Sequence, residues 1–208
     1  MLLHSYTTDL FEGLPCFLLD DQIMLFCNER IVPLDTVLDK LCKSYIMKSI
    51  AAIGISLSFR GIEQIHQFEK QSQYAIRKRS NNTISFFFHC AVDYIISSNN
   101  LQEKLCACMP QIRMLYSERH TKHNEAYKTL KSYLMNGGSI IQASGELGIH
   151  KNTISYRISK FSQSFPLDMN QPYVREYMLT SIRVLENANG LTASANHLNP
   201  TVKEGAQI

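Results

Sequence analysis

Polar and basic side chains recur along one face of the segment from residue 151 to residue 165, for which the spacing predicts a helix. Amide and guanidinium groups can make paired hydrogen bonds to base edges, a Thr methyl can contact thymine, and Lys and Ser can hold phosphates. The segment contains no Asp or Glu, whose charge would repel a phosphate backbone. We therefore expect this helix to read the major groove of double-stranded DNA. The residues expected to contact DNA are His150, Lys151, Asn152, Thr153, Ser155, Tyr156, Arg157 and Lys160.

Two of these residues have an alternative role. Tyr156 can pack its ring within the domain instead of contacting a base, because Tyr combines an apolar body with a polar tip. His150 stands at the expected start of the helix, where it can cap the helix or contact a phosphate. No nucleophile or general base accompanies His150, so we expect no catalytic residue and no enzyme activity.

A short helix and a turn directly before this segment predict how the polar face is positioned. Ser139 suits a helix N-cap, and Gln142 completes a capping-box pattern. Gly148 permits a sharp change of direction between the two helices. Behind the polar face, apolar residues recur at spacings of three and four, which turns one stripe toward a core. The residues expected to hold this helix-turn-helix together are Ser139, Ala143, Leu147, Gly148, Ile149, Ile154 and Ile158.

Further helices are expected on both sides of this motif. One is predicted from residue 121 to residue 135, ended by Asn136-Gly137-Gly138, since Asn and Gly accept the left-handed conformation of a helix end. Another follows the motif and extends to Leu185. Pro110 is expected to start or kink a helix upstream. The region from residue 101 to residue 185 is therefore predicted to be all-α.

The first hundred residues alternate between strand and helix patterns, which predicts an α+β region. Strands are expected at 15–19 and 23–27, with a hairpin turn at 20–22, and again at 51–58 and 83–88. Helices are expected at 36–47 and 61–78. The polar run at 97–100 is predicted to be a linker, and the tail after Glu186 has few residues to bury, so we expect disorder there.

Charge is concentrated in the region of the helix-turn-helix. Eight Lys or Arg and four Asp or Glu lie between His120 and Leu185, which gives this region a net charge of +4, whereas the other residues together carry −1. A nucleic-acid-binding module has such a local excess. No apolar run approaches the roughly 20 residues that span a bilayer, and no signal peptide is evident, so we expect a cytoplasmic protein without membrane contact.

The six cysteines favour reduced, mostly buried thiols over a disulfide framework. Cys106 and Cys108, with His120 and His123 downstream, form the one pattern that could suggest a metal site. Residues two apart on a helix point to different faces, and the spacing matches no common zinc motif. We therefore expect no metal and no cofactor.

The run from Leu147 to Ile158 resembles the C-terminal helix-turn-helix of the PucR/CdaR family of bacterial transcription regulators. The shared pattern is Leu-x-Ile-His-Lys-Asn-Thr-Ile-x-Tyr-Arg-Ile. Upstream, Thr129-Leu130 and Tyr133-Leu134 resemble the family's first helix, and the similarity extends from about residue 110 to residue 185. The resemblance implies a sequence-specific DNA-binding regulator of catabolic genes.

Residues 53–56 and the helix around residue 74 resemble the degenerate GGDEF-like domain that precedes this module in the family. Residues 19–23 fall where active cyclases carry their glycine-rich signature, and this chain lacks both glycines and has Gln22 in place of the glutamate. Cyclase activity is therefore not expected. The resemblance also implies an upstream effector domain that this sequence lacks, so we expect either a fragment or a shortened homologue.

These observations predict an α+β chain in which a partial GGDEF-like α/β-sandwich region precedes an all-α helix-turn-helix domain. The expected divisions are 1–98 for the GGDEF-like domain, 99–118 for a helical linker, 119–187 for the DNA-binding domain and 188–208 for a disordered tail. We expect a homodimer or higher homo-oligomer. The alternative is a protein-interaction or oligomerisation module that does not bind DNA, and salt distinguishes the two, because phosphate binding weakens steeply with salt.

Overall fold

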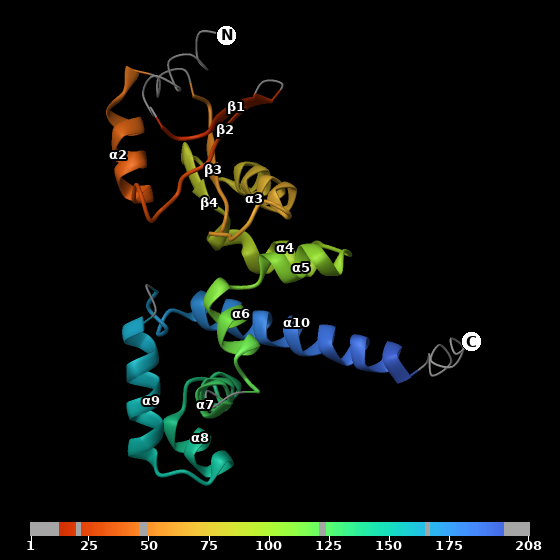
Figure 1. The fold of residues 1–208 in the computed structure, drawn as a ribbon. Coiled ribbons are helices and arrows are strands. Elements are labelled where there is room, and N and C mark those ends of the chain that lie inside the picture. The colour runs from red at the N-terminus through yellow and green to blue at the C-terminus, as the bar shows by residue number, and fades with distance from the viewer. Residues whose placement is uncertain (1–12, 20–21, 46–49, 121–123, 165–166, 198–208) are drawn as a thin grey trace, which may run out of the picture. The chain divides into compact units, whose positions relative to one another are not determined.

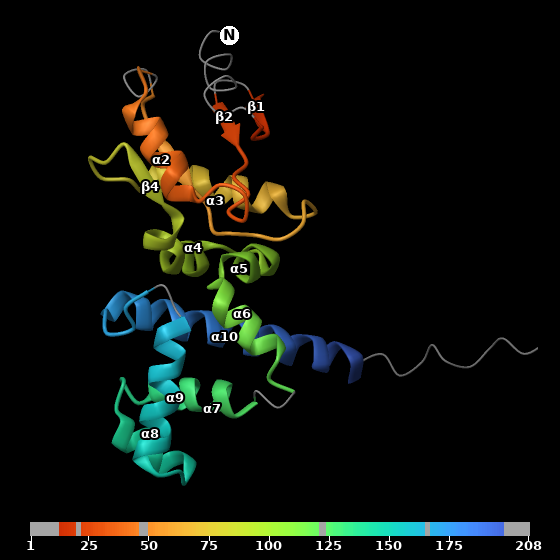
Figure 2. The same ribbon diagram turned by 60° about the vertical axis from the view of Figure 1, so that its left-hand side comes forward.

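The computed structural model describes residues 13–19, 22–45, 50–120, 124–164 and 167–197 (Figures 1 and 2). The described residues form two compact units. The first lies within Met1–Ile53 and Ser80–Ile84, and the second lies within Gly54–Arg79 and Ser85–Ile208. Small strand pairs and helices in the N-terminal part precede an all-helical C-terminal region, so the chain is an α+β protein, as the sequence predicts.

The first unit contains a β-hairpin and one helix. Strands β1 (Cys16–Leu19) and β2 (Gln22–Leu25) pair antiparallel, with Cys16 opposite Leu25, which confirms the predicted hairpin. Helix α2 (Leu34–Lys43) buries Val37 and Leu41, against which Leu25 and other apolar residues of this unit pack. Residues 46 and 47 of the predicted helix lie outside the described residues.

A second pair of strands, β3 (Ile53–Ile55) and β4 (Ile84–Phe86), forms another two-stranded sheet, and the division between the units falls within it. Both strands are shorter than the sequence indicates. After β4 the chain turns into the short 3-10 helix η2 (Phe87–Cys90) instead of continuing as a strand to residue 88. With three residues per turn, η2 places Phe87 and Cys90 on one side, and both are buried.

Helix α3 (Ile65–Lys78) packs closely against β3 at Gly54, where a Cβ atom would clash with the backbone oxygen of Ser72. A glycine is therefore required for this close approach. The helix begins at Ile65, four residues later than the sequence suggests. Gln71 on its buried side accepts a hydrogen bond from the Leu57 backbone and donates one to the carbonyl of Cys106.

Three short helices follow: α4 (Ala91–Ser97), α5 (Leu101–Ala107) and α6 (Pro110–Ser117). Pro110 occupies the first turn of α6, as predicted. The run at 97–100 is a tight turn between helices, because the Asn100 side chain caps α5 by accepting from the backbone N–H groups of Gln102 and Glu103. Helices α4 to α6 share the core of the C-terminal helices, and the domain bounds expected from the sequence stay a prediction.

The last four helices are α7 (Asn124–Met135), α8 (Ile140–Leu147), α9 (Lys151–Ser164) and α10 (Pro172–His197). Helices α7, α8 and α9 contact one another, and α10 contacts α4, α5, α6 and α7. The sequence places the end of the last helix near Leu185 and disorder from residue 188, whereas α10 continues to His197. Ala188 is buried, and the alanines of this stretch favour a helix. Residues 198–208 lie outside the described part.

Helix α10 is the central element of the second unit. The Tyr177 hydroxyl donates to the Ala107 carbonyl at 2.6 Å, and the Ser181 hydroxyl oxygen accepts from the Met109 backbone N–H at 2.9 Å. Both side chains are fully buried, so these bonds satisfy polar groups that would otherwise destabilise the core by about 1–3 kcal/mol each. They fix α10 against the turn between α5 and α6.

The cysteines of the described residues are free thiols, and Cys90, Cys106 and Cys108 are buried. The Cys106 and Cys108 thiols donate to different partners, the side-chain oxygen of Gln64 and the Lys104 carbonyl. Among the described residues, no three His, Cys, Asp or Glu side chains gather in a way that could hold a metal ion, although His123 lies outside that set. None of the described helices is long and apolar enough to cross a membrane.

Candidate nucleic-acid interface

The turn between α7 and α8 follows the predicted pattern. Gly137 and Gly138 adopt positive φ angles of 63° and 87°, which reverse the chain after α7. The Ser139 hydroxyl then accepts from the Gln142 backbone N–H at 3.3 Å and so caps α8. In a capping box the Gln142 side chain would accept a hydrogen bond from the Ser139 N–H. Here the Asn136 carbonyl accepts that bond instead, at 3.1 Å.

Helix α8 ends at a left-handed glycine. Gly148 has φ 65° and donates its N–H to the Ser144 carbonyl, to which the Ile149 N–H also donates at 3.1 Å. A Cβ atom on Gly148 would meet no heavy atom within 4 Å, so the backbone conformation alone favours glycine here. Ala143 is fully buried, and Leu147 and Ile149 pack against the core on either side of the turn.

His150 caps the N-terminus of α9. Its ring Nδ1 accepts from the Asn152 backbone N–H at 3.2 Å, and its carbonyl accepts from the Thr153 N–H at 2.9 Å. Because Nδ1 accepts, the proton of the neutral ring lies on Nε2, which is left as a donor on this exposed residue. The capping role that the sequence suggests for His150 is therefore present, and the Nε2 donor fits the phosphate contact as well.

One stripe of α9 faces the core and the opposite face is exposed. Ile154 is fully buried, Ile158 is nearly so, and Phe161 packs against the same core. Tyr156 has 67% of its surface exposed, so the described residues do not bury its ring. Thr153 lies at the edge of the exposed face and is half-buried. The exposed residues of the helix are Lys151, Asn152, Ser155, Tyr156, Ser159, Lys160, Ser162 and Gln163.

The exposed face of α9 carries cations that have no acidic partner. Within the part of the chain that the structure describes, neither Lys151 nor Lys160 forms an ion pair. Gln163 is exposed and follows Tyr156 by seven residues and Ser159 by four, so it continues the same face by one turn. The sequence prediction missed Gln163, although the same periodicity could have identified it.

Arg157 differs from the other expected contact residues because its guanidinium group is hydrogen-bonded to another helix of the domain. Its Nη1 atom donates to the Glu125 carboxylate at 3.2 Å and to the Thr129 hydroxyl at 3.1 Å, both on α7. Its side chain is 30% exposed. The sequence gave no sign of the contacts that Arg157 makes with Glu125 and Thr129.

Two polar clusters hold α7 against its neighbours. The Ser132 hydroxyl and the Asn136 amide each donate to the Glu146 carboxylate at 2.6 Å, which joins α7 to α8 and holds the pKa of Glu146 below its ordinary value. Lys131 forms an ion pair with Glu186 of α10 at 2.7 Å. The orientation of α8 therefore depends on directional bonds as well as on apolar packing.

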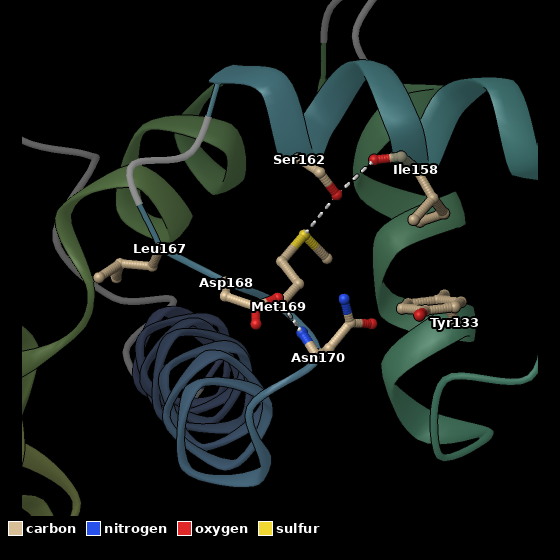
Figure 3. Close-up of a pocket in the computed structure, with 7 residues that line it drawn as sticks. All are labelled: Tyr133, Ile158, Ser162, Leu167, Asp168, Met169 and Asn170. Atoms are coloured by element: carbon tan, nitrogen blue, oxygen red, sulfur yellow. Dashed lines mark hydrogen bonds between the residues drawn. The ribbon is translucent and has the colours of Figure 1, made fainter.

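A hollow of about 430 Å³ lies between α7, α9 and the loop before α10 (Figure 3). Its lining includes Ile158 of the buried stripe, which lies about 160° around α9 from Tyr156, and the exposed Ser162, which lies about 40° from Ile158. The Ser162 hydroxyl contacts the Met169 sulfur at 3.3 Å across it. The remaining lining residues are Tyr133, Leu167, Asp168 and Asn170. None of the residues expected to contact DNA lines this hollow.

Comparison with known proteins identifies the segment that contains this face. Residues 126–184 match the sequence model of the PucR C-terminal helix-turn-helix domain. This segment is therefore similar to the PucR helix-turn-helix domain. The matched segment begins within α7 and ends within α10, and it includes α8, the turn at Gly148 and α9. No curated protein and no solved structure matches the chain significantly.

A PucR helix-turn-helix domain indicates a DNA-binding transcription regulator. The match covers the motif on which the sequence resemblance rested, from Leu147 to Ile158. It does not extend to the first 98 residues, so a GGDEF-like origin for that region stays a prediction.

Proposed function

We propose that the chain is a sequence-specific transcription regulator whose helix α9 enters the major groove of DNA. The observation that carries the proposal is the exposed, acid-free face of α9 within a PucR domain. Helix α9 has 14 residues and therefore a length of about 21 Å, at 1.5 Å per residue. That length exceeds the roughly 12 Å width of the major groove, so several base pairs lie within reach of one helix face.

The exposed residues divide into two kinds of contact. Asn152 can pair with an adenine edge, and Thr153 can bring its methyl group to thymine. Lys151 and Lys160 are free to neutralise phosphates, and Ser155 can donate to the backbone. Tyr156 and Gln163 lie on the same face and extend the contacts along the groove. His150 can donate from Nε2 to a phosphate beside the helix N-terminus.

We also propose an oligomeric state and a cellular location for the protein. We expect a homodimer or higher homo-oligomer that binds half-sites about 10 base pairs, or a multiple of that, apart, because symmetric helix-turn-helix proteins read successive turns of one duplex face. The regulated genes are expected to be catabolic genes, as in the family that the sequence resembles. A regulator of such genes acts where the DNA lies, in the bacterial cytoplasm.

A fluorescence-anisotropy titration tests the proposal. DNA from upstream of the protein's own gene and a scrambled duplex of the same length and composition are titrated over a series of salt concentrations. Tighter binding to the upstream DNA, with an affinity that falls linearly on a log–log plot against salt, supports the proposal. Folded protein that binds neither duplex contradicts it and favours the protein-interaction alternative.

A further inference from the structure

We propose that Arg157 positions the recognition helix α9 on α7 and does not read a base. This inference rests on the proposed function, because its readout is the discrimination between DNA sequences. Arg157 was expected among the DNA-contacting residues, and it differs from the others in one respect. Its guanidinium group already has two partners on another helix, Glu125 and Thr129.

The Thr129 hydroxyl is the decisive partner because it is almost completely buried. Thr129 is 1% exposed, and its Oγ1 donates to the Glu125 carbonyl one turn earlier at 2.7 Å. With its hydrogen committed to that carbonyl, Oγ1 can only accept from Arg157, and it does so at 3.1 Å. If Arg157 left for a base, the buried oxygen would lose its donor, a loss that disfavours the movement.

The place of Arg157 on the helix agrees with this role. At about 100° per residue, Arg157 lies about 60° around the axis from Ile154, at the border of the buried stripe. Asn152 and Tyr156 lie about 160° from Ile154, near the centre of the exposed face. The Arg157 side chain therefore leaves the helix toward α7, and the side chains with an open path to DNA leave from the other side.

The hydrogen bonds from Arg157 to Glu125 and Thr129, here called the tie, restrain the rotation of α9 about its axis, which the apolar stripe does not. Contacts of Ile154 and Ile158 with the core are non-directional, so they resist separation of the helices more than rotation of α9 about its axis. A hydrogen-bonded guanidinium has a preferred direction at each donor. Rotation of α9 would shift every base-reading side chain on the exposed face, so Arg157 governs discrimination between sequences without contact with DNA.

The substitution Thr129→Val tests the tie without a change in charge. Valine keeps the shape of the side chain and removes the acceptor, so Arg157 becomes freer. If Arg157 is a positioning residue, Thr129→Val weakens binding to upstream DNA about tenfold, the effect expected for one charge-assisted hydrogen bond. Binding to scrambled DNA and the salt dependence stay unchanged, because no phosphate contact is lost. Thr180→Val on α10 is the matched control and leaves both affinities unchanged.

The double variant Arg157→Ala/Thr129→Val completes the test, with all variants compared at a temperature at which circular dichroism shows them folded. The positioning role predicts that the double variant discriminates no worse than Arg157→Ala alone, because both changes break one tie. If Thr129→Val keeps or raises the affinity for upstream DNA while Arg157→Ala lowers it, Arg157 contacts DNA directly and the inference is wrong. Wild-type protein that binds neither duplex contradicts the proposed function instead. In that case urea unfolding tests the tie itself, through the effects of the two substitutions on the free energy of unfolding. If these effects are additive in the double variant, the tie is overturned.

Discussion

The phenolic hydroxyl of Tyr127 on α7 donates a hydrogen bond of 2.8 Å to the carboxylate of Glu186 on α10. Lys131, one turn further along α7, donates to both oxygens of the same carboxylate at 2.7 and 2.9 Å. Because α7 also contacts α8 and α9, this cluster connects the helix-turn-helix to the longest helix of the chain. The contact between α7 and α10 therefore depends on the protonation of a buried tyrosine.

Alkaline pH is expected to destabilise the second unit. Burial, followed by the adjacent Glu186 carboxylate, raises the pKa of Tyr127, and burial is the main cause that raises the pKa of Tyr94 and of Tyr173 to about 12. In the unfolded chain these groups titrate near pH 10. Between about pH 10 and 12 the unfolded state binds fewer protons than the folded state, so the free energy of unfolding falls as pH rises. Urea unfolding across this pH range measures the fall.

Two tyrosine variants test whether Tyr127 contributes to the loss of stability at alkaline pH. Tyr127→Phe removes one titrating group, so the fall in stability above about pH 10 becomes shallower, although stability at neutral pH decreases through the loss of the bond to Glu186. Tyr156→Phe removes the hydroxyl of an exposed tyrosine and serves as the control for the substitution itself, with stability at neutral pH close to that of the wild type. Equal profiles for Tyr127→Phe and the wild type would show that burial of Tyr127 has no influence on alkaline unfolding.

Two glycines of the motif should respond to alanine with opposite signs. Gly148 has a left-handed φ, so Gly148→Ala lowers the free energy of unfolding by about 1 kcal/mol. Gly145 lies inside helix α8 with no heavy atom within 4 Å of an added Cβ, so Gly145→Ala raises it by about 0.5–1 kcal/mol. Urea unfolding of the full chain compares them. A shift of both variants in the same direction contradicts the assigned conformations.

Much of the helix-turn-helix could be predicted because its signals are local. A left-handed Gly148, a capping Ser139 and the stripe of Ile154 and Ile158 each follow from residue types within a few positions of one another. The hairpin of β1 and β2 was predictable for the same reason. Helix starts and strand lengths in the first hundred residues were less accurate, because short apolar runs fit a strand, a turn or a 3-10 helix until tertiary contacts decide.

The partners of Arg157 could not be predicted from the sequence. Glu125 and Thr129 precede it by 32 and 28 residues, and no spacing rule connects side chains on different helices. The sequence therefore grouped Arg157 with the exposed cations of α9. The polar run at 97–100 gave a similar ambiguity, since a capped turn between packed helices and a flexible linker have the same composition.

The cap of α9 is expected to contribute to stability through the His150 ring. His150→Ala removes the acceptor of the Asn152 N–H and lowers the free energy of unfolding by about 0.5–2 kcal/mol, as for other N-caps. His150→Asn keeps a side-chain acceptor at the N-cap and retains most of the stability. Thermal unfolding of the two variants measures the difference. An alanine variant as stable as the asparagine variant would argue against the capping role.

The central claim is that the exposed face of α9 binds DNA, and the affinities of Asn152→Ala and Lys160→Ala test it most directly. For Asn152→Ala we predict a loss of about 1–3 kcal/mol on upstream DNA and little change on scrambled DNA. For Lys160→Ala we predict weaker binding to both duplexes and a salt slope smaller by about 0.9. Lys43→Ala on α2 is the matched control. If both α9 variants bind upstream and scrambled DNA as the wild type does, the assignment of this face is wrong.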